Sequence, residues 1–232
     1  KKTPQMLAEV AVAARDLDGA VDATLTTGSS RGVDRGARYV AKCAQAVKEA
    51  SGLPTEVQFE PPLDLDVINE VGDMGIDSVG IHLETFDPAV LARVAPAKFR
   101  TGIDAYFAAW ERAVRVFGPG QVSTYVILGM GEDPDLIVEG AKRAIDIGVY
   151  PLVVPLRPVA GSLMEDIASP PREYTEPIYR RVQAYMTLRG MSHTAAKAGC
   201  ARCNACSGLK SLDSAGGGPI PVSIGRGAPS PM

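Results

Sequence analysis

Residues 55–60 read TEVQFE and residues 78–84 read SVGIHLE. Apolar and polar side chains alternate in both stretches, as in β-strands whose successive residues face opposite sides. The polar faces carry Glu56, Gln58 and Glu60 in the first strand, and Gly80, His82 and Glu84 in the second. A central strand of a doubly wound sheet is covered on both sides and is typically continuous in Val, Ile and Leu. Polar faces on successive strands therefore favour a barrel whose interior binds a polar ligand.

Helices and strands alternate on both sides of these stretches. Strands are predicted over 22–27, 55–59, 78–83, 122–128 and 152–156, and helices over 4–14, 34–50, 64–74, a short segment from Asp87, 103–117, 133–148 and 175–188. Strands joined by such helices pair in parallel through right-handed crossovers. The predicted fold class is α/β: a partial (β/α)6 TIM-type barrel of parallel strands with the first strand missing. It is followed by a Cys-rich extension at the C-terminal side.

Three segments are predicted from the composition. Residues 1–190 form the barrel, 191–210 the Cys-rich extension, and 211–232 a tail rich in Gly, Pro and Ser that we expect to be disordered. A net charge of −3 provides no basic face, so nucleic acid and membrane are not expected as partners. The sequence has no membrane-length apolar run and no signal peptide, which favours a cytoplasmic protein.

Polar or glycine-rich residues follow the predicted strands, at the end where βα barrels bind their ligands. They are residues 26–30, Gln58, Glu60, His82, Glu84, 129–132 and 155–158. A carboxylate such as Glu84 is costly in a barrel interior unless it is paired or solvated, which favours a working site. The simpler interpretations are that Gly129 and Gly131 only form a tight turn and that His82 is a core residue. Cys43 lies on the apolar stripe of a helix and is predicted to be core.

The strand-end motifs occur in a recognisable order. They are His82-Leu83-Glu84-Thr85, Gly129-Met130-Gly131-Glu132 and Leu156-Arg157-Pro158. This order, over roughly residues 5 to 190, resembles the radical S-adenosylmethionine (radical SAM) superfamily, in particular its biotin synthase and lipoyl synthase branch. The chain is most similar to an uncharacterised family whose genes neighbour those of nitrilases.

The resemblance implies an activity and its cofactors. Such enzymes use a [4Fe-4S] cluster to cleave S-adenosylmethionine reductively, and the resulting 5′-deoxyadenosyl radical acts here on an unknown small-molecule substrate. The implied partner is an electron donor such as flavodoxin or ferredoxin. The implied cofactor-binding residues are Thr27, Gly28 and Ser29 near the methionyl amino group, His82 and Glu84, Gly129 and Gly131 beside the adenine, and Arg157.

The chain departs from the family pattern at three places. The usual Asn of the fourth-strand motif is His82, and an Arg expected before Pro96 is Ala95. The carboxylate of the cofactor would then be bound by Arg93, Lys98 or Arg157. The family's C-x3-C-x2-C loop, which holds the catalytic cluster, is absent. We therefore expect a truncated record of an enzyme, and a fragment that is inactive on its own.

The C-terminal extension carries Cys200, Cys203 and Cys206 in a C-x2-C-x2-C run. This spacing is typical of iron–sulfur ligands and predicts an auxiliary [4Fe-4S] cluster with one open position. A zinc site completed by His193, or no metal, are the alternatives. A non-catalytic iron–sulfur or zinc-binding barrel is thus the competing function. An aldolase with a Schiff-base lysine is disfavoured because no lysine is predicted at a strand end.

Overall fold

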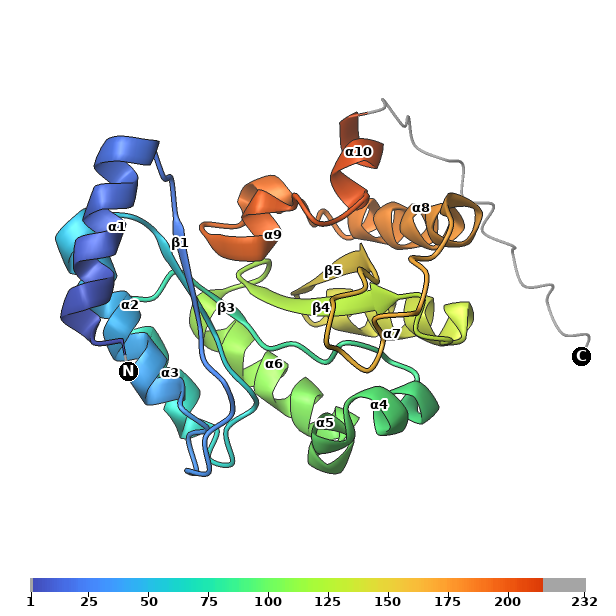
Figure 1. Ribbon diagram of the computed structural model, residues 1–232, viewed down its shortest axis with the longest axis horizontal. Coiled ribbons are helices and arrows are strands. Elements are labelled where there is room, and N and C mark those ends of the chain that lie inside the picture. The colour runs from blue at the N-terminus through green and yellow to red at the C-terminus, as the bar shows by residue number, and fades with distance from the viewer. Residues whose placement is uncertain (1, 215–232) are drawn as a thin grey trace, which may run out of the picture.

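The computed structural model describes residues 2–214 (Figure 1). The tail that the sequence predicts as disordered lies outside the described residues, apart from residues 211–214. Those four residues belong to α10 (Leu209–Ser214). No helix among the described residues is long and apolar enough to cross a membrane.

A five-stranded, entirely parallel sheet forms the centre of the molecule, with the strands in sequence order. The strands are β1 (Ala23–Thr26), β2 (Thr55–Gln58), β3 (Ser78–Gly80), β4 (Val122–Leu128) and β5 (Val149–Pro155). Sequential order with helical crossovers is the topology of a barrel, because a doubly wound sheet reverses its strand order. The α/β partial TIM-type barrel predicted from the sequence is therefore confirmed.

Helices cover the outer face of this sheet (Figure 1). The helices that precede the Cys-rich extension are α1 (Pro4–Asp18), α2 (Ala37–Ser51), α3 (Asp66–Asp73), α4 (Pro88–Val94), α5 (Pro96–Thr101), α6 (Ile103–Phe117), α7 (Pro134–Asp146) and α8 (Arg172–Leu188). The core between helices and sheet is apolar and includes Val57, Val79, Ile81, Trp110 and Ile137. Trp110 is fully buried and donates its Nε1–H to the Ile81 carbonyl at 2.9 Å.

Side-chain caps mark the start of three of these helices, α1, α4 and α7. Asp87 caps α4 with bonds from the Ala89 and Val90 N–H groups, and Asp133 caps α7 in the same way. The prediction that α2 begins at Asp34 is wrong. Its N-cap is Gly36, and the Asp34 carboxylate accepts from the Gly36 N–H just before the helix.

The Cys-rich extension lies on the inner face of the sheet, opposite the helices (Figure 1). It contains a 3-10 turn, η1 (His193–Ala195), and α9 (Gly199–Cys203). Polar side chains from the strands and their connections hold it: Gln121 bonds the Ala195 carbonyl and the Lys197 N–H, both at 2.9 Å, and Ser78 donates to the Ala198 carbonyl at 3.1 Å. The barrel interior is thus lined by strands and closed by this extension.

Candidate functional site

One lysine and two carboxylates meet at the carboxyl ends of β2 and β3. Lys98 Nζ lies 2.9 Å from Glu60 Oε1 and 2.8 Å from Glu84 Oε1, and it also donates to the His82 carbonyl at 2.5 Å. The Tyr106 hydroxyl donates to the other Glu60 oxygen. The three charged side chains are 18–24% exposed, so this Lys98 cluster is shielded without being sealed. Two carboxylates against one ammonium leave a formal charge of −1 that favours a cationic ligand.

Lys98 reaches this strand end from α5, which the sequence did not predict as a separate helix. The argument that no lysine is found at a strand end is therefore wrong. Because two carboxylates and a carbonyl already engage the ammonium, Lys98 is placed for charge pairing rather than as a free nucleophilic amine.

Glu84 has a left-handed backbone, with φ +78°. Few non-glycine residues adopt this conformation, and it costs about 1–3 kcal/mol. Its N–H and carbonyl both bond to β4, through the Tyr125 carbonyl at 3.1 Å and the Ile127 N–H at 2.8 Å. The backbone is thus held in place while the side chain projects toward the barrel interior.

A pocket of about 330 Å³ opens beside Glu84. Its lining is mostly apolar and consists of Glu84, Tyr125, Ile127, Val154, Pro155, Arg157 and Cys206. The strand-end pocket therefore brings together two predicted cofactor-binding residues, Glu84 and Arg157, and one predicted metal ligand, Cys206. These three residues come from β-strand ends and the C-terminal extension, far apart in sequence.

The three candidates for binding a ligand carboxylate differ in availability. The Arg93 guanidinium donates to the Met130 carbonyl, and Lys98 is held by Glu60 and Glu84. Arg157 is exposed, and within residues 2–214 its guanidinium forms no hydrogen bond or ion pair. Arg157 is thus the residue that can take an anionic group at the strand-end pocket.

In the Gly129–Glu132 turn, in contrast to the end of β3, the acidic side chain is engaged by the turn's own backbone. The Glu132 carboxylate is buried and accepts from the N–H groups of Gly129 and Met130 and from the Tyr174 hydroxyl, all at 2.7 Å. Gly129 has φ +97°, and a Cβ there would lie 2.7 Å from Pro170. The turn therefore needs glycine for its backbone and its packing, which favours the simpler interpretation of a tight turn.

Thr27, Gly28 and Ser29 follow β1 at the open edge of the sheet. Gly28 and Ser29 are exposed, and the Thr27 hydroxyl donates to the Gly28 carbonyl at 3.1 Å. None of the three lines the strand-end pocket. Their predicted role beside the methionyl amino group remains a prediction.

His82 is partly exposed as a whole residue, although its Nε2 atom is buried, and it does not line the pocket. Its Nδ1 accepts the Tyr125 N–H at 3.1 Å, and its ring packs edge-on against the Tyr125 ring at 4.6 Å. Burial lowers the pKa of His82 to about 3, so its ring is neutral near pH 7. Its Nε2 is buried and has no partner among the described residues. His82 therefore positions Tyr125, a role that the sequence did not reveal.

The three cysteines of the extension have different surroundings. The Cys200 sulfur accepts from Gln58 Nε2 and from the Tyr125 hydroxyl, both at 3.3 Å, whereas Cys203 and Cys206 are exposed. Burial, reinforced by the nearby Glu56 charge, raises the pKa of the Cys200 thiol to about 11. Cys200 is thus the cysteine that faces the barrel interior.

Cys200, Cys203 and Cys206 are suitable metal ligands by their chemistry, but their side chains are not arranged around a common point. Three soft thiols suit iron–sulfur or zinc. Among residues 2–214, however, no three His, Cys, Asp or Glu side chains are gathered closely enough to hold a metal ion, and this includes His193. Exposed side chains can change rotamer at little cost, so Cys203 and Cys206 are the two that would have to move toward Cys200.

Glu56 holds Cys200 against the inner wall of the barrel. Its carboxylate accepts from Thr24, Gln58, Ser123 and the Cys200 N–H at 2.9–3.3 Å. Burial raises its pKa despite these bonds. A Cβ on Gly199 would lie 2.2 Å from Glu56 Cδ, so only glycine allows this contact. The sequence placed Glu56 on the polar face, and the structure shows that its partner there is the extension.

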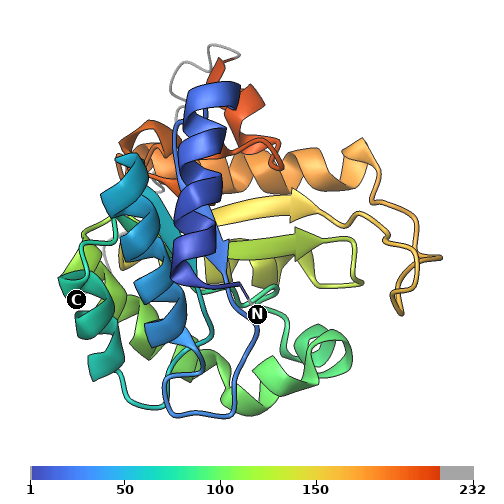
Figure 2. The same ribbon diagram turned by 60° about the vertical axis from the view of Figure 1, so that its left-hand side comes forward.

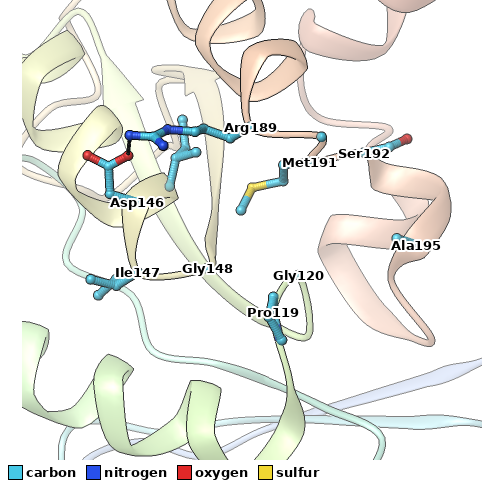
Figure 3. A pocket seen from close by; sticks show the side chains of 11 residues that line it. Pro119, Gly120, Asp146, Ile147, Gly148, Arg189, Met191, Ser192 and Ala195 are labelled. Atoms are coloured by element: carbon cyan, nitrogen blue, oxygen red, sulfur yellow. Dashed lines mark ion pairs between the residues drawn. The ribbon is translucent and has the colours of Figure 1, made fainter.

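A second pocket, of about 390 Å³, lies at the opposite end of the strands, where α7 and α8 end (Figure 3). Met191, Ile147 and Pro119 line it, and Asp146 and Arg189 pair across its edge at 2.6 Å. The charges of Asp146 and Arg189 neutralise each other in this pair. In addition, βα barrels bind their ligands at the carboxyl ends of the strands, which is the opposite end of the barrel. The strand-end pocket is therefore the better candidate for a functional site.

No family model matches the chain. Bacteriochlorophyllide c C-7(1)-hydroxylase of Chlorobaculum limnaeum is 32% identical over 106 residues, which is 45% of this chain and 26% of that protein.

Three solved structures share the fold. Methylornithine synthase (PylB) aligns with a TM-score of 0.60 at 18% identity, over 89% of this chain and 61% of its own. HydG, a maturase of the [FeFe]-hydrogenase, aligns with a TM-score of 0.59 at 15% identity, over 82% and 43%. A radical SAM methyltransferase from Sphaerobacter thermophilus aligns with a TM-score of 0.59 at 16% identity, over 82% and 56%. The chain thus spans about a quarter of the curated relative and 43–61% of these solved chains.

Proposed function

We propose that this chain is the barrel part of a radical SAM enzyme that binds S-adenosylmethionine at the strand-end pocket. The observation that carries the proposal is the Lys98 cluster, whose formal charge of −1 lies beside a mostly apolar pocket. S-adenosylmethionine is positively charged at its sulfonium and α-ammonium groups and negatively charged at its carboxylate. Glu84 complements the former and Arg157 the latter. The shared fold with a radical SAM methyltransferase supports the same conclusion.

The division of work among the residues follows from their positions. Glu84 attracts a cationic part of the cofactor, Lys98 forms ion pairs with both Glu60 and Glu84, and Arg157 receives the carboxylate of the cofactor. The apolar walls, Ile127 and Val154, exclude water from the space between them. A reduced [4Fe-4S] cluster would supply the electron that cleaves the cofactor to the 5′-deoxyadenosyl radical. Flavodoxin or ferredoxin is the proposed source of that electron, and the substrate is a small molecule.

We further propose Cys200, Cys203 and Cys206 as ligands of an auxiliary [4Fe-4S] cluster. The support is the donor set and its position, since Cys206 lines the strand-end pocket and Cys200 faces the barrel interior. A centre on these residues would lie next to the bound ligand.

Calorimetric titration of the chain with S-adenosylmethionine tests the proposal. The neutral analogue S-adenosylhomocysteine, which lacks only the S-methyl group and with it the sulfonium charge, should bind more weakly. Glu84→Gln should weaken S-adenosylmethionine binding by about tenfold or more, equivalent to about 1.4 kcal/mol. The control is Glu139→Gln on the exposed face of α7, which should bind like the wild type. Equal affinity for the two ligands, or an unchanged Glu84→Gln variant, would refute the site.

A further inference from the structure

The connection between β5 and α8 is a long loop that begins at the strand-end pocket. Residues 156–171 contain neither helix nor strand, and every residue from Arg157 to Ser169 is exposed except Met164, which is half-buried. Figure 2 shows this segment, in yellow to orange, extending beyond the arrowheads of β4 and β5. Connections longer than about 12–15 residues without secondary structure are uncommon in compact domains and usually serve a function.

Both ends of this loop are attached to the end of β4. The Leu156 N–H donates to the Leu128 carbonyl at 2.8 Å, and Pro170 packs so closely on Gly129 that a Cβ there would lie 2.7 Å from it. Leu128 and Gly129 are consecutive, so the loop leaves the sheet and returns to it at one point. Loops whose ends meet in this way form compact units and are frequently functional.

The loop exposes three large apolar side chains on successive turns. Val159, Leu163 and Ile167 are 64%, 107% and 44% exposed. The Ser162 N–H bonds to the Val159 carbonyl and the Ile167 N–H to the Met164 carbonyl, both at 3.1 Å, so the backbone that carries these side chains is ordered by its own bonds. Apolar side chains grouped on one exposed segment mark a contact surface.

The strand-end pocket offers an apolar surface at the base of this loop. Its walls include Ile127 and Val154, and its lining continues through Pro155 and Arg157, which lie on either side of the first loop residue. A pocket that is open to solvent does not by itself exclude water from a bound ligand. Enzymes commonly achieve this exclusion by closing a loop over the site.

We propose that residues 157–169 form a lid whose side chains Val159, Leu163 and Ile167 cover the ligand in the strand-end pocket. This inference rests on the ligand site proposed above. When the ligand is bound, these side chains move from water onto the ligand and the apolar walls, and this burial stabilises the complex. The contribution of the lid lies mainly in a slower dissociation of the ligand. Leu163 is the most exposed of the three and has the most surface to bury.

A reporter tryptophan tests the movement of the lid. The chain has one tryptophan, Trp110, which is fully buried in the core, so Leu163→Trp places a second one on the lid. On addition of S-adenosylmethionine we expect the emission of this variant to shift to shorter wavelength and its quenching by acrylamide to decrease, because the new ring leaves water. The wild-type protein, titrated in the same way, corrects for Trp110.

Binding kinetics test the contribution of the lid to affinity. Leu163→Ser should weaken S-adenosylmethionine binding about tenfold, through faster dissociation. Its thermal unfolding should match the wild type, because the Leu163 side chain is fully exposed in the free protein. Leu163→Met keeps an apolar side chain of similar volume and should bind like the wild type. The matched control is Leu17→Ser, since Leu17 is 83% exposed on α1, before the amino end of β1, and its replacement should leave binding unchanged.

The outcomes that contradict the inference can be told apart. If S-adenosylmethionine binds without changing the Leu163→Trp emission, or if Leu163→Ser dissociates at the wild-type rate, the loop is not a lid, although the ligand site stands. If the emission changes with protein concentration instead of with ligand, and sedimentation shows a dimer, the apolar side chains contact a second copy of the chain. If the wild-type chain does not bind S-adenosylmethionine, the ligand site fails and the lid fails with it.

Discussion

β3 and β4 are neighbouring parallel strands, so their carboxyl ends point the same way, as the adjacent arrows of β4 and β5 do in Figure 2. After β3, Glu84 has a left-handed backbone, and the buried His82 Nε2 has no partner among the described residues. After β4, the Glu132 carboxylate accepts the N–H groups of Gly129 and Met130, so the turn supplies the acceptor for two of its own donors. The first strand end carries strain and an unpaired polar atom, and the second carries neither.

This difference separates two acidic residues that look equivalent in the sequence. Strain and unmet hydrogen bonds persist where the surrounding structure imposes them, and they concentrate at functional sites. A carboxylate that already has its full set of donors has no capacity left for a ligand. We therefore treat Glu84 as the ligand-binding carboxylate and Glu132 as part of the fold.

Among the variants considered, replacement of Glu132 should cause the largest loss of unfolding free energy. Glu132→Ala leaves two backbone N–H groups and the Tyr174 hydroxyl without their buried acceptor. Such losses add up to about 4 kcal/mol of unfolding free energy. Urea denaturation measures it, with Glu139→Ala, whose carboxylate is exposed, expected within about 0.5 kcal/mol of the wild type. A loss below about 1 kcal/mol would remove the distinction between the two turns.

The lowered pKa of His82 should make the unfolding free energy of the protein depend on pH in the acid range. Its pKa falls from 6.5 to about 3 in the folded protein, so between these pH values the unfolded chain binds more protons than the folded one. The unfolding free energy should therefore decrease as the pH falls through this window, by up to about 1.4 kcal/mol per unit and about 3 kcal/mol by pH 4.5.

His82→Asn isolates this contribution, because an Asn carbonyl can accept the Tyr125 N–H without titrating. Unfolding curves of both proteins are compared between pH 7 and pH 4.5. The variant should lose less stability across this range than the wild type. Parallel pH profiles would show that His82 does not carry the effect.

Glu84→Gly should give the smallest change in stability. Glycine adopts φ +78° without strain, and this gain offsets the lost ion pair with Lys98, which keeps Glu60. The unfolding free energy should stay within about 1 kcal/mol of the wild type, while S-adenosylmethionine binding is lost. Thermal unfolding and calorimetry on the same sample check both parts. A variant that binds normally would mean that the strain serves another purpose.

Periodicity and turn residues predicted most of the fold. The β4 limits were predicted as found, and the parallel order followed from the alternation of helices and strands. β5 begins three residues earlier than predicted and includes Pro151. β5 lies at an edge of the described sheet, where a proline does not interrupt a ladder on its free side.

The end of β3 shows why a pattern alone does not predict a site. The predicted strand runs to Leu83, whereas the observed one ends at Gly80. Beyond it, side chains interrupt the backbone ladder between Ile81 and Glu84: Thr124 accepts the Leu83 N–H and His82 accepts the Tyr125 N–H. Such bonds depend on partners about 40 residues away, so local periodicity does not contain them. The same holds for Lys98, which reaches the strand ends from a helix, and for the attachment of Cys200 to Glu56.

The attachment of the extension also has a consequence for the order of folding. Its bonds to the strands join residues 54 to 144 positions apart, whereas each strand pairs with a neighbour closer in sequence. Contacts between distant residues form late because they close the longest loops. The sheet can therefore assemble while its inner face is still open to solvent, and the cysteines reach the barrel interior last.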